Sequence, residues 1–258
     1  MLLSDFSLWG LIFICGGVFT ASLVDAIAGG GGIISLPVYI ISGLPAHAAI
    51  GTNKMSSCIG TSVSTLRYIK NGYADWKLAI PSVALALPGA VIGAKLQLMA
   101  DERILKYFLI FILPFIAFIV LKQKKLPEER LEINPSVQKA VIYGFSFLIS
   151  IYDGFYGPGT GTFLLLAFCN LGKLDVRTAS GNMKIVNFSS NISALITTLL
   201  AGEVYVTLGL LAAVFSIGGH YIGSGLTIKN GSKIVRPVII TVLLLLTLKV
   251  AVEVFQNL

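Results

Sequence analysis

Two lysines stand inside apolar segments, and similar polar residues precede each of them. Lys54 ends the run GTNK and Lys184 ends the run GNMK. A lysine at the centre of a membrane helix costs roughly 2.5–3.5 kcal/mol, so two at matching places indicate a function. An ammonium group can neutralise a bound anion, while Thr52, Asn53 and Asn182 can donate hydrogen bonds to it.

Two glycine clusters follow acidic residues, after Asp25 and after Asp153. Consecutive glycines break a helix, because each costs about 1 kcal/mol relative to alanine. A half-helix that begins after the break points free N–H groups at it, which favours an anion. We therefore predict a substrate site made of the two lysines with Thr52, Asn53, Asn182, Gly29, Gly30, Gly31, Gly32, Gly157, Gly159, Thr160, Gly161 and Thr162.

The two aspartates allow two interpretations. Asp25 and Asp153 are candidates for proton coupling, by exchanging a lysine partner for a proton. They are equally candidates for internal ion pairs, Asp25 with Lys54 and Asp153 with Lys184. The glycines could also serve close helix packing alone. We expect His220, inside an apolar span, to be structural, with a proton-relay role left open.

The composition excludes a soluble domain. Of the 258 residues, 55% are hydrophobic and 12% charged, whereas a soluble domain carries about 25% charged residues. With ~20 apolar residues per span, the chain can cross a membrane about eight times. The net charge of +7 is interpreted as loop lysines on the cytoplasmic side, not as a nucleic-acid surface. No HExxH, Walker A or GxSxG motif is present, and we expect no enzyme activity, catalytic residue, metal or cofactor.

The apolar stretches predict an all-α membrane protein with about eight transmembrane helices. Two further stretches, 33–43 and 161–171, are too short to span and follow the glycine clusters, so we predict half-helices there. The predicted spans are 8–28, 46–69, 76–99, 104–121, 137–152, 178–200, 204–227 and 235–255.

The chain also shows an internal repeat. A shift of 130 residues matches Lys54 with Lys184, and a shift of 128 matches Asp25 with Asp153. We predict two homologous four-span repeats, 1–122 and 137–258, joined by a polar linker at 123–136. With eight full spans, the linker shares a face with Arg67, Lys70 and Lys77, and the opposite face carries Arg103, Lys106, Lys173, Arg177, Lys229, Lys233 and Arg236. The two faces nearly balance, so the positive-inside rule leaves the orientation open.

At these residues the chain resembles the TauE/SafE sulfite-exporter family of bacterial membrane permeases, and its YfcA-like members in particular. The resemblance covers nearly the whole chain. It rests on VDAIAGGGGIISLP at 24–37, AAIGTNKMSS at 48–57, YDGFYGPGTGTFLLLAF at 152–168, TASGNMKIVNFSSNI at 178–192 and RPVIITVLLLLTLKV at 236–250. It implies two four-span halves that move sulfur oxyanions or small organosulfur solutes, with coupling to the proton gradient.

We therefore expect a multi-pass transporter of a small anion in the bacterial inner membrane. The anion, a sulfur oxyanion or organosulfonate, would be carried by alternating access, with proton coupling. The expected partners are the anionic solute and the lipid bilayer, without nucleic acid, and a homo-oligomer is left open. The alternatives are a sodium or other cation carrier, with Asp25 and Asp153 completing the cation site, and a membrane scaffold that transports nothing.

Overall fold

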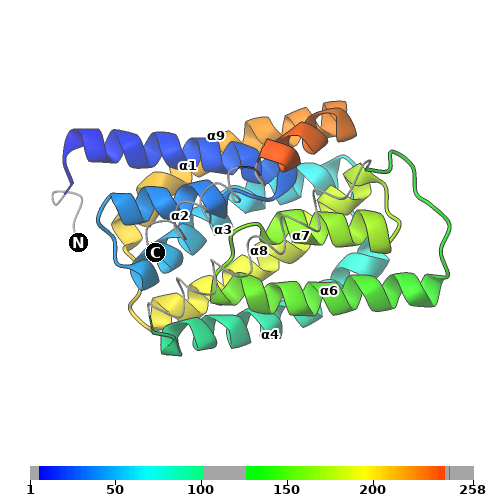
Figure 1. Cartoon of the computed structure of the whole chain (residues 1–258), viewed down its shortest axis with the longest axis horizontal. Coiled ribbons are helices and arrows are strands. Elements are labelled where there is room, and N and C mark those ends of the chain that lie inside the picture. Colours follow the sequence, from blue (N-terminus) through cyan, green and yellow to red (C-terminus); the bar gives the residue numbers. More distant parts are fainter. Residues whose placement is uncertain (1–5, 102–125, 242–243, 245–258) are drawn as a thin grey trace.

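A computed structural model of the protein describes residues 6–101, 126–241 and 244. Within these residues the chain is helical and contains no strand, as predicted. The helices are α1 (Leu8–Ala28), α2 (Gly32–Ile41), α3 (Ala46–Lys70), α4 (Trp76–Met99), α6 (Pro135–Phe155), α7 (Thr160–Leu166), α8 (Val176–Leu200) and α9 (Val206–Asn230), with a π-helical stretch η2 (Ala167–Leu171) after α7 (Figure 1).

Six of the eight predicted spans coincide with long helices in this set. The predicted spans at 104–121 and most of 235–255 lie outside the described residues. The two short helices predicted after the glycine clusters are α2 and α7 with its continuation η2.

Polar caps define where several helices begin. The Ser7 side chain accepts a hydrogen bond from the backbone N–H of Gly10 at the start of α1. Asn134 caps α6 in the same way, followed by Pro135, whose missing N–H costs nothing at the first helical position. Asp175 accepts hydrogen bonds from two backbone N–H groups at the start of α8.

Three of these helices, α1, α4 and α9, are long and apolar enough to cross a membrane. Each exposes large apolar side chains, such as Trp9 on α1, Ile80 on α4 and Val214 on α9. Such faces suit contact with lipid tails. By contrast, α3 and α8 carry the two lysines and many buried polar residues, so they suit the interior of the protein.

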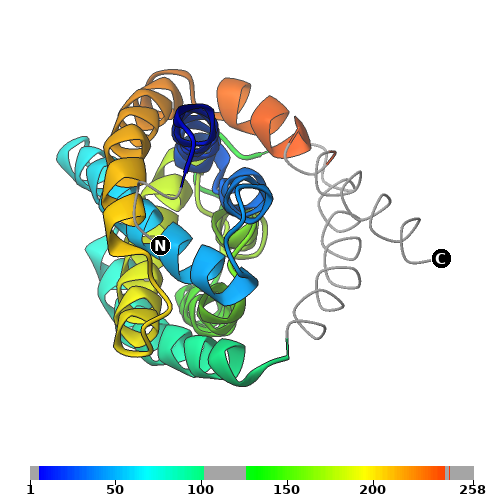
Figure 2. The same ribbon diagram turned by 90° about the vertical axis from the view of Figure 1, so that its left-hand side faces the viewer.

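The long helices pack in the spatial order α1, α9, α3, α8, α4 and α6. Figure 2 looks along the bundle, with α1 beside α9 at one edge and α4 beside α6 at the opposite edge. The two lysine-bearing helices therefore lie next to each other in the middle of this row.

Each short helix folds back along the helix before it. A side-chain carbon on Gly17 of α1 would lie 2.6 Å from Val38, in the second half of α2. Gly31, which directly precedes α2, lies against the Ala21 carbonyl, further along α1. The second hairpin closes in the same way, because Gln138 at the start of α6 donates a hydrogen bond to the carbonyl oxygen of Gly172 (2.5 Å). Each hairpin thus returns to the end of the molecule from which it started.

The basic residues consequently gather at one end of the molecule. Of the eleven described Lys and Arg other than Lys54 and Lys184, Lys95 lies at the N-terminal end of the bundle, and the other ten lie at the linker end. Those ten are Arg67, Lys70, Lys77, Arg130, Lys139, Lys173, Arg177, Lys229, Lys233 and Arg236.

This distribution corrects the predicted balance of charge between two faces. The prediction placed Lys173, Arg177, Lys229, Lys233 and Arg236 opposite the linker, and that placement is wrong. Contacts link these residues to the linker end: the N–H of Leu131 donates to the carbonyl of Lys173, and Arg177 donates to the carbonyl of Ile228. The prediction failed because it did not count α2 and α7 with η2, each of which returns the chain to the end from which its hairpin started.

Small residues bring the neighbouring helices into backbone contact. A side-chain carbon on Gly93 of α4 would collide with the carbonyl oxygen of Ile151 on α6 and lie 2.7 Å from the N–H nitrogen of Phe155. On the opposite edge, a side-chain carbon on Gly223 of α9 would lie 2.5 Å from the Leu23 carbonyl oxygen of α1. Glycine at these positions lets the helices approach closely.

We expect Gly93→Ala to destabilise the detergent-purified protein by about 1–3 kcal/mol, the usual cost of overpacking. The matched control is Gly144→Ala on α6, where a side-chain carbon meets nothing within 4 Å. Thermal unfolding should show a lower midpoint for the first variant and an equal or higher midpoint for the second. Equal effects of both substitutions would contradict the close packing of α4 on α6.

Candidate functional site

The tips of the two hairpins touch in the interior. Gly29 ends α1 in the left-handed conformation (φ 79°), and its carbonyl oxygen accepts a hydrogen bond from the N–H of Thr162 (3.2 Å). The Thr162 hydroxyl donates to the carbonyl oxygen of Ala28 (2.7 Å). A side-chain carbon on Gly29 or on Gly161 would collide with the backbone of the other tip. The glycines therefore allow the two chain breaks to pack directly on each other.

Lys184 from α8 forms an ion pair and a hydrogen bond with Asp25, near the end of α1. Its Nζ lies 2.6 Å from Asp25 Oδ2 and 2.6 Å from the Asp25 carbonyl oxygen, and its side chain is fully buried. The other carboxylate oxygen accepts the N–H of Gly31 at 3.2 Å. Because carbonyl groups at a helix C-terminus carry partial negative charge, both the carboxylate and the helix end stabilise this ammonium group.

Lys54 from α3 forms the corresponding pair with the end of α6. Its Nζ lies 2.8 Å from Asp153 Oδ1, and both side chains are 3% exposed. The second carboxylate oxygen accepts a hydrogen bond from the Ser190 hydroxyl at 2.7 Å. Both charges and the spare oxygen are therefore satisfied inside the protein, as a buried pair requires.

The pairing differs from the ion-pair interpretation of the sequence, which joined Lys54 to Asp25 and Lys184 to Asp153. Each lysine instead binds the aspartate that lies in the other half of the chain. The cause is the crossing of α3 and α8, where the Thr65 hydroxyl donates to the Lys184 carbonyl oxygen (3.2 Å). Side by side, each helix brings its lysine to the tip of the other hairpin.

Several of the remaining predicted site residues already form hydrogen bonds within the protein. Thr52 accepts the N–H of Tyr205 at 3.0 Å, and the Asn182 amide donates to the Thr178 carbonyl oxygen at 2.9 Å. Thr160 donates to the Gly157 carbonyl oxygen at 2.7 Å. The tips themselves contain Gly30, Gly31, Gly32, Gly157 and Gly159, the last two in the left-handed region.

Among the predicted site residues, all of which are described, two buried amide oxygens have no hydrogen-bond partner, Asn53 Oδ1 and Asn182 Oδ1. Asn53 lines a small polar cavity of about 10 Å³ together with Asp25, Ser22, Ser35, Ser56, Ser57 and His220. That volume is about the room one water molecule needs. The cavity therefore has no room for a solute much larger than water, and neither lysine lines it.

Sequence reasoning did not connect His220 with this site. Its Nε2 lies 3.7 Å from Asp25 Oδ2, and its Nδ1 lies 3.1 Å from the Ser64 hydroxyl. Ser190, whose hydroxyl donates to Asp153 Oδ2, was not among the predicted site residues either. The one available signal for His220 was a titratable residue within the glycine-rich stretch of α9. Among the described residues, no three His, Cys, Asp or Glu side chains are grouped as metal ligands.

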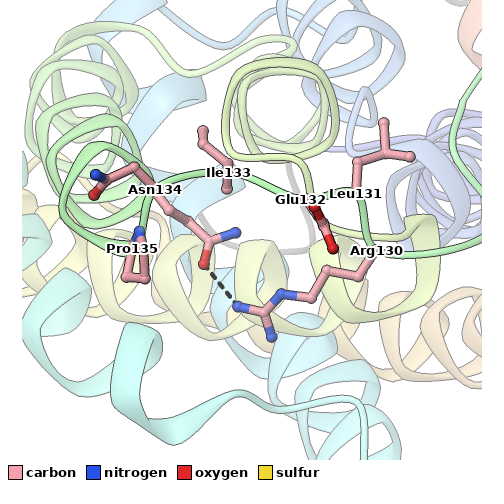
Figure 3. Close-up of a pocket in the computed structure, with 7 residues that line it drawn as sticks. Arg130, Leu131, Glu132, Ile133, Asn134 and Pro135 are labelled. Carbon is pink, nitrogen blue, oxygen red and sulfur yellow. Dashed lines mark hydrogen bonds between the residues drawn. The ribbon is translucent and has the colours of Figure 1, made fainter.

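A larger, open pocket of about 690 Å³ lies at the linker end and contains none of the predicted site residues. Figure 3 shows it lined by the linker residues from Arg130 to Pro135. Arg130 donates hydrogen bonds to Gln138 at 2.7 Å and to Asp75 at 3.2 Å. This pocket therefore belongs to the attachment of the linker to α6 and to the turn before α4.

Comparison with known proteins identifies the family. The profile of the family described as "Sulfite exporter TauE/SafE" matches residues 13–250. A "probable membrane transporter protein ORF9" from Sinorhizobium sp. is 32% identical, over 97% of this chain and 96% of the relative. A "probable membrane transporter protein" from Haemophilus influenzae is 30% identical, over 94% of each chain. The "probable membrane transporter protein YfcA" of Escherichia coli K12 is 31% identical, over 86% and 82%.

No solved structure matches the chain. The family profile and the relatives each cover most of its length. The chain therefore belongs to the sulfite exporter TauE/SafE family of membrane transporters, and it is a membrane protein.

The crossed pairing can be tested with double variants. Lys54→Met should destabilise the protein by about 3–5 kcal/mol, because it leaves the Asp153 carboxylate buried and unpaired. Adding Asp153→Leu should recover most of the lost stability. Adding Asp25→Leu should instead lower the stability further, because it leaves the Lys184 ammonium group without its carboxylate partner. Thermal unfolding of the purified variants measures both. Recovery with Asp25→Leu instead would contradict the observed pairing.

Proposed function

We propose that this family member carries a small anion, a sulfur oxyanion or organosulfonate, across the bacterial inner membrane in a proton-coupled, alternating-access cycle. The observation that carries the proposal is the pair of buried lysines, Lys54 and Lys184, each with a single carboxylate partner. The description of the family as sulfite exporters favours sulfur oxyanions as the class of solute.

The charge of the site explains why a proton would accompany the anion. Each lysine is already neutralised by an aspartate, so an entering anion has to replace that carboxylate. A displaced, charged aspartate would be left unpaired in the interior, at a cost of several kcal/mol. One proton taken up per negative charge keeps the site neutral. The unpartnered Asn53 Oδ1 and Asn182 Oδ1 would accept hydrogen bonds from an acidic or hydroxyl group of the anion or from water.

Two inverted repeats would supply the two conformations that alternating access needs. In support, α1 and α6 are both 21 residues long, and α3 and α8 both 25. Contacts recur at the repeat spacing as well: Gly51 lies against the Glu203 carbonyl, and Gly181 against the Tyr73 carbonyl. The hairpins enter from opposite ends, and rocking of the halves would open each tip in turn.

The positive-inside rule would place the linker end in the cytoplasm. Cytoplasmic loops carry an excess of Lys and Arg, and ten of the eleven described basic residues outside the two pairs lie at that end. The N-terminus and the turn between α8 and α9 would then face the outside of the cell.

A cation carrier is the second candidate, since a broken helix also presents carbonyl oxygens. The pairing argues against it, because Asp25 and Asp153 are each bound to an ammonium group. A scaffold that transports nothing is favoured by one observation, the direct packing of Gly29 on Gly161. Measurements of ligand binding distinguish the anion carrier, the cation carrier and the scaffold from one another.

We expect sulfite or sulfoacetate to raise the unfolding midpoint of the purified protein, at matched ionic strength against chloride and sodium. A ligand at one hundred times its Kd stabilises by about 2.7 kcal/mol. Lys184→Ala should abolish the increase, and Lys95→Ala, which removes an exposed lysine, should keep it. An increase with sodium alone would select the cation carrier, and no increase with any ligand would select the scaffold.

The orientation predicts which surface a membrane-impermeant maleimide reaches. The native cysteines are buried, so single exposed cysteines report on their own positions. In intact cells, Ala201→Cys should be labelled and Glu132→Cys should be protected until the cells are opened. The reverse pattern would place the linker outside and contradict the proposed orientation.

A further inference from the structure

We infer that the Asp25–Lys184 pair is the one that opens during transport, with His220 as the second partner of Asp25, while the Asp153–Lys54 pair stays closed as an anchor. The inference rests on the proposed proton-coupled anion transport and assigns the coupling to one of two similar pairs. It makes the two halves of the protein unequal in function.

His220 is positioned to replace Lys184. Its Nε2 lies 3.7 Å from Asp25 Oδ2, the same oxygen that binds Lys184 at 2.6 Å. The ring is held on its other side, where Nδ1 lies 3.1 Å from the Ser64 hydroxyl. The gap to Asp25 is slightly longer than a hydrogen bond, so a small rotation of the carboxylate away from Lys184 closes it.

The surroundings of Asp25 also give it room for proton exchange. The cavity of about 10 Å³ borders both Asp25 and His220, and the unpartnered Asn53 Oδ1 belongs to its lining residues. Such a volume holds about one water molecule, and an unsatisfied buried oxygen favours a polar occupant. The Asp25 side chain is 16% exposed, against 3% for Asp153.

The carboxylate of the second pair accepts a hydrogen bond from a hydroxyl group, whereas the His220 imidazole lies beside the carboxylate of the first pair. Ser190 donates to Asp153 Oδ2 at 2.7 Å, which holds both carboxylate oxygens in place. At the repeat spacing of 130 residues, Ser190 corresponds to Gly60 and His220 corresponds to Ala90. A side-chain carbon on Gly60 would lie 2.5 Å from the His220 ring. Glycine thus admits the imidazole at one pair, and serine closes the other.

The proton and charge balance follows from the groups that face Asp25. These are Lys184 from α8, His220 from α9 and the N–H of Gly31, which directly precedes α2. When one anion enters, Lys184 pairs with it, and Asp25 and His220 together take up one proton, which the carboxylate and the imidazole share. The summed charge is zero before and after.

Carbodiimide labelling tests this asymmetry without any substrate. Dicyclohexylcarbodiimide adds to protonated carboxyl groups in apolar surroundings, and mass spectrometry of digested protein locates the adduct. We expect wild-type protein in detergent to be labelled at Asp25 as the pH falls, with Asp153 at least tenfold less labelled. His220→Gln should shift the pH of half-maximal Asp25 labelling by at least one unit, and Ser190→Ala should leave that pH unchanged.

Equal labelling of both carboxyl groups, or no labelling of Asp25 at any pH, would overturn the inference. An unchanged labelling profile in His220→Gln would remove His220 from the role of second partner. The wild-type comparison needs no variant, so a misfolded variant cannot hide the result. The proposed function fails separately, if no sulfur anion stabilises the protein, because the labelling uses no anion.

Discussion

A charged lysine in an apolar interior needs a counter-charge in direct contact. This protein meets that requirement twice, each time with an aspartate from the other half of the chain. Lys54 of α3 binds Asp153 of α6, and Lys184 of α8 binds Asp25 of α1. An unpaired charge at either place would cost several kcal/mol. The pairs consequently stabilise the arrangement in which the two lysine-bearing helices cross, and they join the first half of the chain to the second.

The glycine tips follow from the same constraint. Gly29 ends α1 in the interior in the left-handed conformation, close to the place where the Asp25 carboxylate meets Lys184 of α8. The end of the helix also contributes its carbonyl oxygen to Lys184 (2.6 Å). The same groups that make the pairs stable therefore lie where two chain breaks meet. A structure that separates the tips would expose them.

Much of this could be predicted from the sequence, because each feature departs from an apolar background. The lysines, the aspartates and the glycine clusters were identified by type, and the short helices after the glycines were placed within a few residues. The choice of partner could not be predicted, because it depends on the crossing of α3 and α8. The basic residues were assigned to two opposite faces because hydropathy does not distinguish a hairpin of two helices from a single helix that crosses the membrane. His220 was missed as a neighbour of Asp25 because the two are distant in sequence.

The central claim is that an anion replaces a carboxylate on a buried lysine and that a proton enters with it. Proton uptake in weakly buffered detergent solution, followed with a pH indicator while sulfite or sulfoacetate is added, tests this most directly. The account predicts about one proton taken up by the protein per negative charge bound, and none in Asp25→Asn. Saturable binding of the anion to wild-type protein without proton uptake would contradict it.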